Sequence, residues 1–375
     1  MSLEEYRKEI DAIDKQIVEL YEKRMEVSDK VALYKIENHR NVYDPEREAA
    51  KLDKIRDLAH NEFNAKGAAE LILHIMSESR KKQYALLEEH NVGVRLPFIP
   101  VDSLDTKNAR VVFQGVNGAY SEAAMIQFFG EDVNAHPVDT FRDAMRSIDE
   151  GTADFAVLPI ENSSAGIVSA NYDLLTEFEN YIVAEQVIEI DNCLMGVPGT
   201  DIADIKTIYS HPQALMQCAP FIESNKQWRA ISFSNTAMAA KKIHDDNDKT
   251  QAAIAGSRAA DVYGLEILKR DINFSDGNST RFIIVTNQKI FVKNAKKVSI
   301  CFEIENKSGT LYSILSHVIY NDLNMSKIES RPIANRPWHY RFFLDFEGNL
   351  SDAAVRNALR GIREEARNLR ILGNY

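Results

Sequence analysis

Residues 2–38 read SLEEYRKEIDAIDKQIVELYEKRMEVSDKVALYKIEN, a run that contains neither glycine nor proline. Ser2 and Glu5 have the spacing of a capping box, which marks the start of a helix. Apolar residues recur at helical spacing and form one stripe along this run: Tyr6, Ile10, Ile13, Ile17, Leu20, Val27 and Val31. The run therefore predicts one long helix with a single apolar face.

Two more helices are expected after this run. Asp44 followed by Pro45 is a typical N-cap and first-turn pair, and a third helix is predicted from about Ala68 to Glu89. One long helix and two shorter ones cannot cover each other completely. The uncovered part of the stripe should pack against a second copy of the chain, so we expect an intertwined homodimer or a higher homo-oligomer.

Four polar side chains interrupt the apolar faces of these helices. Arg24 and Lys35 fall near the middle of the first stripe, and Ser79 and Gln83 lie one turn apart on the third helix. A single such residue is equally well explained by a side chain that reaches water or pairs with a neighbouring glutamate. Four together are costly to bury without partners, so a small cationic pocket between helices is the better interpretation.

The pattern changes after this helical region. Residues 91–109 contain two prolines and no sustained periodicity, which is typical of a linker. From Arg110, apolar runs such as RVVFQ, FAVLPI and RFIIV alternate with helical patterns such as EAAMIQFF and AMAAKKI, which predicts an α/β domain. Polar residues after several strands are expected to cap the helices that follow them: Ser121, Thr140, Ser210 beside His211, Asn235 with Thr236, and Ser257.

The last part of the chain predicts a third kind of domain. After Lys297 the order is strand, helix, strand, strand, helix, strand, which is the ferredoxin-like α+β arrangement. Domains of this kind serve many functions, so the order alone identifies none.

Composition limits the classes of function. A chain of 375 residues predicts about two or three domains. Its net charge of −11 gives no broad basic surface for nucleic acid or an anionic membrane. Cys193, Cys218 and Cys301 lie far apart outside any CxxC pair, so we expect neither a zinc site nor a disulfide framework. No signal peptide or membrane span is visible, so we expect a cytoplasmic protein. We also expect it to bind neither a metal nor a cofactor.

The helical part resembles a known enzyme family. The run YRKEIDAID, Arg24, Lys35, the DPEREAAKL stretch and the Ser79/Gln83 pair resemble the all-helical chorismate mutases over residues 1 to about 90. The resemblance implies roles for eight residues: Arg7, Arg24 and Arg47 bind the two substrate carboxylates, one arginine coming from the partner subunit; Lys35 and Gln83 contact the ether oxygen; and Asp44, Glu48 and Ser79 position the substrate hydroxyl and its surroundings.

The chemistry suits these side chains. A Claisen rearrangement breaks a C–O bond and forms a C–C bond within one molecule, so it needs no nucleophile. It needs a restrained substrate and donors for the negative charge that develops on oxygen. Two carboxylates explain the arginines.

The α/β part resembles the prephenate dehydratases over residues 110–286. The resemblance is carried by GVNGAYS (115–121), PIENSSAG (159–166), YSHPQAL (209–215), SNTAMAA and GNSTRF (277–282), in this order. It implies two α/β subdomains similar to those of periplasmic solute-binding proteins, with the active site in the cleft between them. It implies that Thr280 is catalytic, assisted by Glu161 and Asn162, and that the substrate is bound by Ser121, Ser210, Gln213 and Arg281; Arg281 serves either the substrate carboxylate or the geometry of the site.

The C-terminal part resembles the ACT domains of the same enzymes, in the segments GTLYSIL and IESRP. That resemblance implies L-phenylalanine as a feedback effector, bound between paired domains near Gly309, Leu311, Glu329, Ser330 and Arg331.

Together these features predict a multidomain, bifunctional enzyme of phenylalanine biosynthesis. We expect a chorismate mutase domain at 1–92, a linker at 93–109, a prephenate dehydratase domain at 110–286 and a regulatory ACT domain at 297–375. Its small-molecule partners would be chorismate, prephenate and L-phenylalanine, with neither nucleic acid nor membrane. Two alternatives stay open: a non-catalytic amino-acid sensor, and a dehydratase that prefers arogenate.

Overall fold

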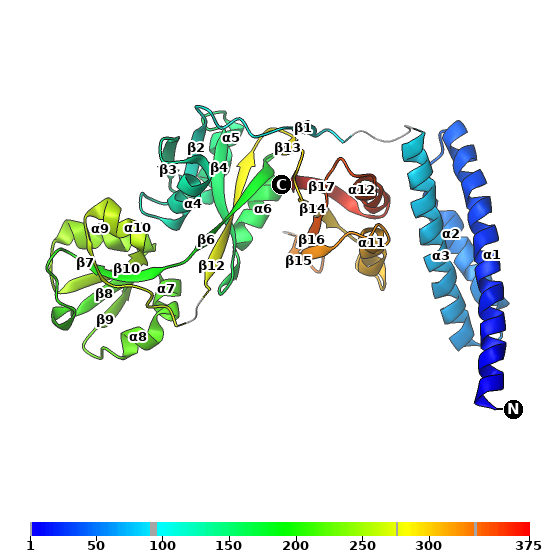
Figure 1. Ribbon diagram of the computed structural model, residues 1–375, viewed down its shortest axis with the longest axis horizontal. Helices are drawn as coiled ribbons and strands as arrows, with labels where there is room; N and C mark the ends of the chain where they lie inside the picture. The colour runs from blue at the N-terminus through cyan, green and yellow to red at the C-terminus, as the bar shows by residue number, and fades with distance from the viewer. Residues whose placement is uncertain (1, 91–95, 275–276, 334–335) are drawn as a thin grey trace. The chain divides into compact units, whose positions relative to one another are not determined.

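The computed structural model describes residues 2–90, 96–274, 277–333 and 336–375, which form two compact units (Figure 1). The first unit contains residues 1–98 and 295–371, and the second contains residues 99–294 and 372–375. Residues 91–95 of the expected linker lie outside the described residues.

Three helices form the N-terminal part of the first unit (Figure 1): α1 (Leu3–Glu37), α2 (Pro45–Leu58) and α3 (Glu62–Glu89). The expected capping box at Ser2 is present, and the Asp44 carboxylate caps α2 by accepting from the Arg47 amide at 3.1 Å. The α3 helix begins earlier than expected, because the Asn61 side chain accepts from the Asn64 amide at 2.8 Å and so caps its first turn.

The apolar stripe of α1 is largely uncovered. Its seven residues from Tyr6 to Val31 are between 38% and 65% exposed, whereas the buried residues of α1 are Met25, Ser28 and Ala32. Within this unit α3 packs against α1, and the buried residues of α1 lie in its C-terminal half. An uncovered stripe of this kind was predicted from the sequence.

The C-terminal part of the first unit has the expected order βαββαβ: β14 (Lys297–Glu303), α11 (Thr310–Ile319), β15 (Met325–Pro332), β16 (Tyr340–Glu347), α12 (Ala353–Glu365) and β17 (Arg367–Asn374). The strands lie in the order β15-β16-β14-β17. Ile300 and Phe302 of the sheet are buried, as are Ile314 of α11 and Ile362 of α12. The two helices pack closely where Gly361 meets the His317 ring.

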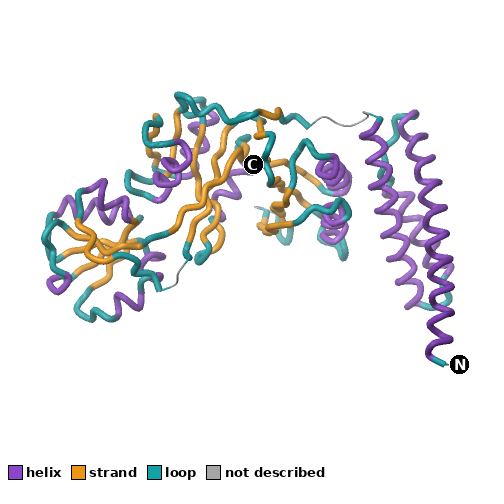
Figure 2. Tube along the Cα trace, in the orientation of Figure 1, coloured by secondary structure: helices purple, strands orange, loops and turns teal. Residues whose placement is uncertain are grey.

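The second unit contains two sheets with helices on them (Figure 2). In the first, the strands lie in the order β6-β12-β4-β2-β3, and β5 pairs with β4. Apolar residues of this sheet, among them Phe113, Val157 and Phe282, pack against Ala124 and Met125 of α4. The elements are β2 (Arg110–Gln114), α4 (Tyr120–Phe129), β3 (Asn134–Val138), α5 (Phe141–Asp149), β4 (Phe155–Asn162), β5 (Gly166–Ile167), α6 (Ser169–Glu177), β6 (Tyr181–Glu189) and β12 (Ser279–Thr286).

The second sheet is formed by the chain between β6 and β12, and its strand order is β11-β7-β10-β8-β9. Successive residues of its central strand enter different cores, as the alternation of strand side chains requires: Ala253 and Ala255 join one cluster, and Ala252 and Ile254 join the other. The elements are β7 (Asn192–Gly196), the 3-10 helix η1 (Ile202–Asp204), β8 (Thr207–Ser210), α7 (Pro212–Gln217), α8 (Ala219–Glu223), β9 (Arg229–Ser232), α9 (Thr236–Asp246), β10 (Gln251–Gly256), α10 (Ser257–Tyr263) and β11 (Glu266–Lys269).

A small separate ladder completes this unit: β1 (Ile99–Val101) pairs in parallel with β13 (Ile290–Val292). Residues 99–101 belong to the stretch that the sequence assigned to a linker, so this stretch contains a paired strand. Across the described residues, we find no helix that combines the length and the apolar character needed to span a membrane.

The expected helix caps were partly wrong. Thr140 and Asn235 cap α5 and α9. Ser121, Ser210 and Ser257 do not act as caps, because the cap positions of α4, α7 and α10 are Ala119, His211 and Gly256. Ser121 and Ser257 instead lie inside their helices, and the Ser210 hydroxyl donates to the Ile254 carbonyl at 2.6 Å.

Candidate functional site

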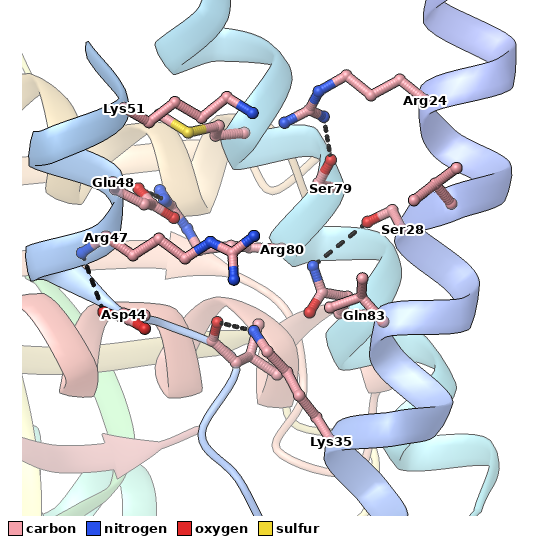
Figure 3. Close-up of a pocket in the computed structure, with 14 residues that line it drawn as sticks. Arg24, Ser28, Lys35, Asp44, Arg47, Glu48, Lys51, Ser79, Arg80 and Gln83 are labelled. Carbon is pink, nitrogen blue, oxygen red and sulfur yellow. Dashed lines mark hydrogen bonds and ion pairs between the residues drawn. The ribbon is translucent and has the colours of Figure 1, made fainter. Parts of the chain in front are cut away.

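A cavity of about 240 Å³ lies among the three N-terminal helices (Figure 3). Side chains from α1, α2 and α3 point into it from opposite sides. All four polar residues that interrupt the predicted apolar stripes contribute to its wall. The lining residues are Arg24, Val27, Ser28, Val31, Lys35, Val42, Asp44, Arg47, Glu48, Lys51, Met76, Ser79, Arg80 and Gln83.

Hydrogen bonds hold several of these side chains in place. The Arg24 guanidinium donates to Ser79 Oγ and, at 3.3 Å, to the Ile75 carbonyl. The Lys35 ammonium donates to the Val42 carbonyl in the segment between α1 and α2. Gln83 Nε2 donates to Ser28 Oγ at 3.3 Å, and the Gln83 Oε1 atom is buried without a hydrogen-bond partner among the described residues. The helices therefore fix one guanidinium, one ammonium and one amide at the cavity wall.

The cavity favours an anionic ligand. Five of its lining side chains are basic (Arg24, Lys35, Arg47, Lys51, Arg80) and two are acidic (Asp44, Glu48). Burial lowers the pKa of Lys35, and the nearby Asp44 carboxylate only partly offsets this. Burial also lowers the pKa of Arg24. In both cases burial outweighs the nearby negative charge, and a bound carboxylate would add to that charge.

Arg7 does not line this cavity. It lies 17 residues before Arg24 on the same helix, a separation of about 26 Å along the axis at ~1.5 Å per residue. An extended arginine side chain is far shorter than this distance. If Arg7 contributes to a pocket of this kind, the pocket belongs to another copy of the chain.

The sequence reading missed three polar residues of the cavity wall: Ser28, Lys51 and Arg80. Arg80 is 4% exposed and lies directly after Ser79. Its partners are Glu48 of α2 and Glu365 of α12, and the second of these is distant in sequence. No local pattern could have revealed this contact.

In the second unit the structure brings together the two polar segments PIENSSAG and GNSTRF. Strands β4 and β12 are antiparallel neighbours, with Thr280 opposite Asn162 and Arg281 opposite Glu161. Asn162 Nδ2 donates to Thr280 Oγ1 and to Asn278 Oδ1, each at 2.9 Å. The Ser163 amide donates to the Ser279 carbonyl at 2.8 Å, and Ser163 Oγ accepts from the Ser279 amide at 2.9 Å. Thr280 is only 8% exposed.

Arg281 has different neighbours from Thr280. It forms ion pairs with Glu161 at 2.9 Å and Glu185 at 3.3 Å. Consecutive residues of a strand point to opposite faces of the sheet, so Thr280 with Asn162 and Arg281 with Glu161 form two separate pairs. A register shift directly after Arg281 marks an irregularity at this position.

The other three expected substrate-binding residues lie on other elements. Ser121 is buried in the first turn of α4, Ser210 is buried at the end of β8, and Gln213 lies in the first turn of α7. The Tyr120 hydroxyl beside Ser121 donates to Asn192 Oδ1 at 3.3 Å, and Asn192 Nδ2 donates to Gln217 Oε1 at 3.2 Å. Asn192, which the sequence reading missed, thus connects α4 of the first sheet with α7 of the second.

Asn278 is a further residue that the sequence reading missed. It is 4% exposed, and its Oδ1 accepts from Asn162 Nδ2 and, at 3.2 Å, from Ser164 Oγ. Its own Nδ2 is buried without a partner among the described residues. Its place inside the GNSTRF segment was the available signal.

The residues expected to contact an amino-acid effector lie on two elements of the C-terminal region. Gly309 is the N-cap of α11 with a φ of +85°, a left-handed conformation that favours glycine, and Leu311 lies in the first turn of that helix. Glu329, Ser330 and Arg331 lie on β15 at the edge of the sheet.

Comparison with known proteins agrees with both halves of this picture. A family model described as chorismate mutase type II matches residues 6–84, and one described as prephenate dehydratase matches residues 111–290. The bifunctional chorismate mutase/prephenate dehydratase of Enterobacter agglomerans is 32% identical over 377 residues, which covers 98% of this chain and 94% of that protein.

Two further relatives cover the part of the chain after the helices. The chloroplastic arogenate dehydratase/prephenate dehydratase 1 of Arabidopsis thaliana is 37% identical over 287 residues, covering 72% of this chain and 73% of that protein. The solved structure of the Arthrobacter aurescens prephenate dehydratase in complex with L-Phe is 32% identical, with a TM-score of 0.66, covering 71% of this chain and 89% of that one. With both family models matched and one relative alike over almost its full length, the chain belongs to the bifunctional chorismate mutase/prephenate dehydratase family.

Proposed function

We propose that this chain converts chorismate to prephenate in the helical cavity and prephenate to phenylpyruvate at the β4–β12 site. The observation that carries the first step is the excess of basic over acidic side chains around a cavity of about 240 Å³. Chorismate and prephenate each carry two carboxylates, and paired guanidinium groups are well suited to hold them.

In the mutase step, Arg24, Arg47 and the Arg7 of a second copy would hold the substrate carboxylates. Lys35 and Gln83 would donate hydrogen bonds to the ether oxygen as the C–O bond breaks, and Asp44, Glu48 and Ser79 would position the substrate hydroxyl. Such donors stabilise the charge that develops in the transition state more than they stabilise the ground state.

The orientation of the Gln83 amide matters for this step. With Nε2 donating to Ser28, the buried Oε1 acceptor has no partner among the described residues. A half-turn of the amide would let Ser28 Oγ donate to Oε1 and would free Nε2 to donate into the cavity, and the two orientations have nearly the same shape. We propose that the turned orientation is the one that acts on the ether oxygen.

In the dehydratase step, prephenate takes up one proton and loses CO2 and water, leaving phenylpyruvate. Thr280 Oγ1 already accepts a hydrogen bond from Asn162. Its own proton is therefore available for the departing ring hydroxyl, and accepting from Asn162 makes it a better donor. Arg281, which is ion-paired with two glutamates, would maintain the geometry of the site rather than bind the substrate carboxylate.

Separate sites predict separable defects. Lys35→Ala should lower mutase activity by about 100- to 1000-fold, which is the usual effect of removing one such donor, and should spare the dehydratase. Thr280→Ala should lower the dehydratase by at least about 100-fold and spare the mutase. The assay follows phenylpyruvate formation from chorismate and, separately, from supplied prephenate. Loss of both activities by either change in folded protein would contradict the proposal.

Arogenate is a second candidate substrate for the dehydratase step, because one relative carries both substrate names. Arogenate has an amino group where prephenate has a keto group. Comparing kcat/KM for the two substrates decides between them. A chain that yields no product from chorismate, prephenate or arogenate would instead be the non-catalytic sensor.

Regulation by L-phenylalanine is the third part of the proposal. A prephenate dehydratase structure that contains L-Phe aligns with 71% of this chain. We propose an ACT domain at 297–375 that binds the effector near Gly309, Leu311, Glu329, Ser330 and Arg331 and favours a less active state. The mutase and dehydratase domains would span 1–92 and 110–286, joined by a linker at 93–109. Dehydratase rates unchanged up to millimolar L-phenylalanine would rule out feedback.

A further inference from the structure

Arg80 lies between the helical cavity and the C-terminal domain. It lies on α3 between Ser79 and Gln83, and it lines the 240 Å³ cavity. It also lines a second cavity of about 360 Å³, whose wall includes Gly309 and Ser313 of the C-terminal domain. The same side chain therefore belongs to the walls of both cavities.

The Arg80 guanidinium is held by two carboxylates from different domains. Its Nη1 bonds to Glu48 of α2, and its Nη2 bonds to Glu365 of α12 at 3.2 Å. The guanidinium also lies over the Tyr43 ring, 5.1 Å from its centroid. The Arg80, Glu48 and Glu365 side chains are 5%, 18% and 9% exposed, so these charges depend strongly on one another. Figure 3 shows Arg80 and Glu48 together at the cavity wall.

Glu365 is itself anchored within the C-terminal domain. It accepts from Ser313 Oγ and contacts His317 Nε2 at 2.8 Å, so that α11 and α12 both hold its position. Burial alone would raise the pKa of Glu365, but the contacts with His317, Ser313 and Arg80 outweigh burial and lower it. The carboxylate is therefore a charged and firmly placed partner for Arg80.

A neighbouring contact fixes the same interface. The Tyr84 hydroxyl, one turn after Arg80, bonds to Glu364, which also accepts from the Tyr43 amide at 3.1 Å. Consecutive glutamates of α12 thus hold both α3 and the segment that leads into α2. That segment contains Val42, whose carbonyl holds the Lys35 ammonium.

We propose that Arg80 is a positioning residue for the mutase reaction, and that Glu365 of the C-terminal domain holds it in place. Arg80 would fix the Glu48 carboxylate at the substrate hydroxyl. Among the described residues, the lining of the cavity comes from the three helices and the segment between α1 and α2. The C-terminal domain would therefore support the mutase pocket through Glu365 without lining it. This inference rests on the proposed mutase function of the cavity.

The first test compares Arg80→Met, Arg80→Lys and Glu365→Gln in the full-length chain. Arg80→Met should lower mutase kcat by about 10- to 100-fold with little change in KM, because a misplaced group costs rate more than binding. Arg80→Lys should restore only part of the loss, since an ammonium cannot bridge two carboxylates as a planar fork does. Glu365→Gln should lower kcat by about 3- to 10-fold, the effect of weakening one charged hydrogen bond.

A double-mutant cycle tests the route through Arg80. Glu48 and Glu365 share Arg80 as a partner, so the effects of Glu48→Gln and Glu365→Gln on mutase kcat should not add. Fully additive effects would show that the two glutamates act independently, which overturns the proposal.

The matched control is Lys82→Met. Lys82 is also on α3 and also forms an ion pair with another helix, through Asp29 of α1 at 2.7 Å, but it is outside the cavity lining. It should leave mutase kcat within about twofold of the unchanged chain, as exposed ion pairs usually contribute little. Dehydratase activity on supplied prephenate and the thermal unfolding midpoint report whether each variant is folded.

The outcomes separate this inference from the proposed function. If Lys35→Ala abolishes mutase activity but Glu365→Gln and Arg80→Met leave kcat unchanged, the cavity is the mutase site and the positioning role is wrong. If Lys35→Ala leaves mutase activity intact, the assignment of the cavity itself fails. If Arg80→Met does not fold, Glu365→Gln and the double-mutant cycle still decide the question.

Discussion

At the scale of single residues, the protonation of Lys35 gives the sharpest prediction. In the proposed mutase step the charged ammonium of Lys35 would stabilise the ether oxygen far better than the neutral amine, and burial lowers the Lys35 pKa below the ordinary 10.5. Mutase kcat/KM should therefore be constant below this lowered pKa and fall as the pH rises through it. In Lys35→Arg the guanidinium stays charged, so any activity that remains should lose this alkaline decline.

The measurement is a pH profile of mutase kcat/KM, which reports ionisations of the free enzyme. The control is Lys82→Arg. The Lys82 ammonium is exposed and ion-paired, so this variant should keep the pH profile of the unchanged chain. An alkaline decline that is the same in Lys35→Arg and in the unchanged chain would assign the ionisation to another group.

The sequence was sufficient to find some residues of the two sites and not others. Lys35 and Gln83 were found because each interrupts an apolar stripe of its own helix. Arg80 and Asn278 were missed, although Arg80 directly follows Ser79 and Asn278 lies two residues before Thr280. Their partners Glu365 and Asn162 are distant in sequence. Arg281 and Thr280 were predicted as neighbours, but strand alternation gives them different partners.

At the scale of secondary-structure elements, two helical glycines provide a matched pair. A Cβ at Gly361 of α12 would collide with the His317 ring of α11, whereas a Cβ at Gly67 of α3 would have nothing within 4 Å. Gly361→Ala should therefore destabilise the C-terminal domain by about 1–3 kcal/mol through overpacking. Gly67→Ala should stabilise the helical part by about 0.5–1 kcal/mol, since alanine is the better helix former.

Chemical denaturation of the two variants, followed by circular dichroism, measures both changes. The two substitutions are chemically identical, so a difference in the sign of their effects on stability must come from their surroundings. A stabilised Gly361→Ala variant would mean that α11 and α12 do not pack as closely as His317 and Gly361 indicate.

Elements were predictable where local chemistry decides them. The capping box at Ser2 and the Asp44–Pro45 start of α2 depend only on neighbouring residues, and both were correct. Strands β3, β9 and β11 were not predicted, and each lies at the edge of its sheet. Edge strands are short and partly exposed, and β3 even contains Pro137, so they lack the apolar pattern of central strands.

At the scale of the whole molecule, the uncovered α1 stripe and the position of Arg7 lead to the same expectation. The stripe residues from Tyr6 to Leu20 are between 46% and 65% exposed, and Arg7 lies among them. Burying such a stripe against a second copy would place the Arg7 of one chain near the cavity of the other. One interface would then both stabilise the helices and complete the site.

Subunit mixing tests this arrangement directly. Arg7→Ala and Lys35→Ala chains should each lack mutase activity, since every site in each homodimer has one defect. In a mixed dimer, one site carries both defects and the other carries none. Random re-association of equal amounts, after unfolding and refolding together, should therefore restore about one quarter of the unchanged activity. If Arg7 served the cavity of its own chain, every site would keep one defect and mixing would restore nothing. A dehydratase rate that stays constant through the procedure confirms that the chains have refolded.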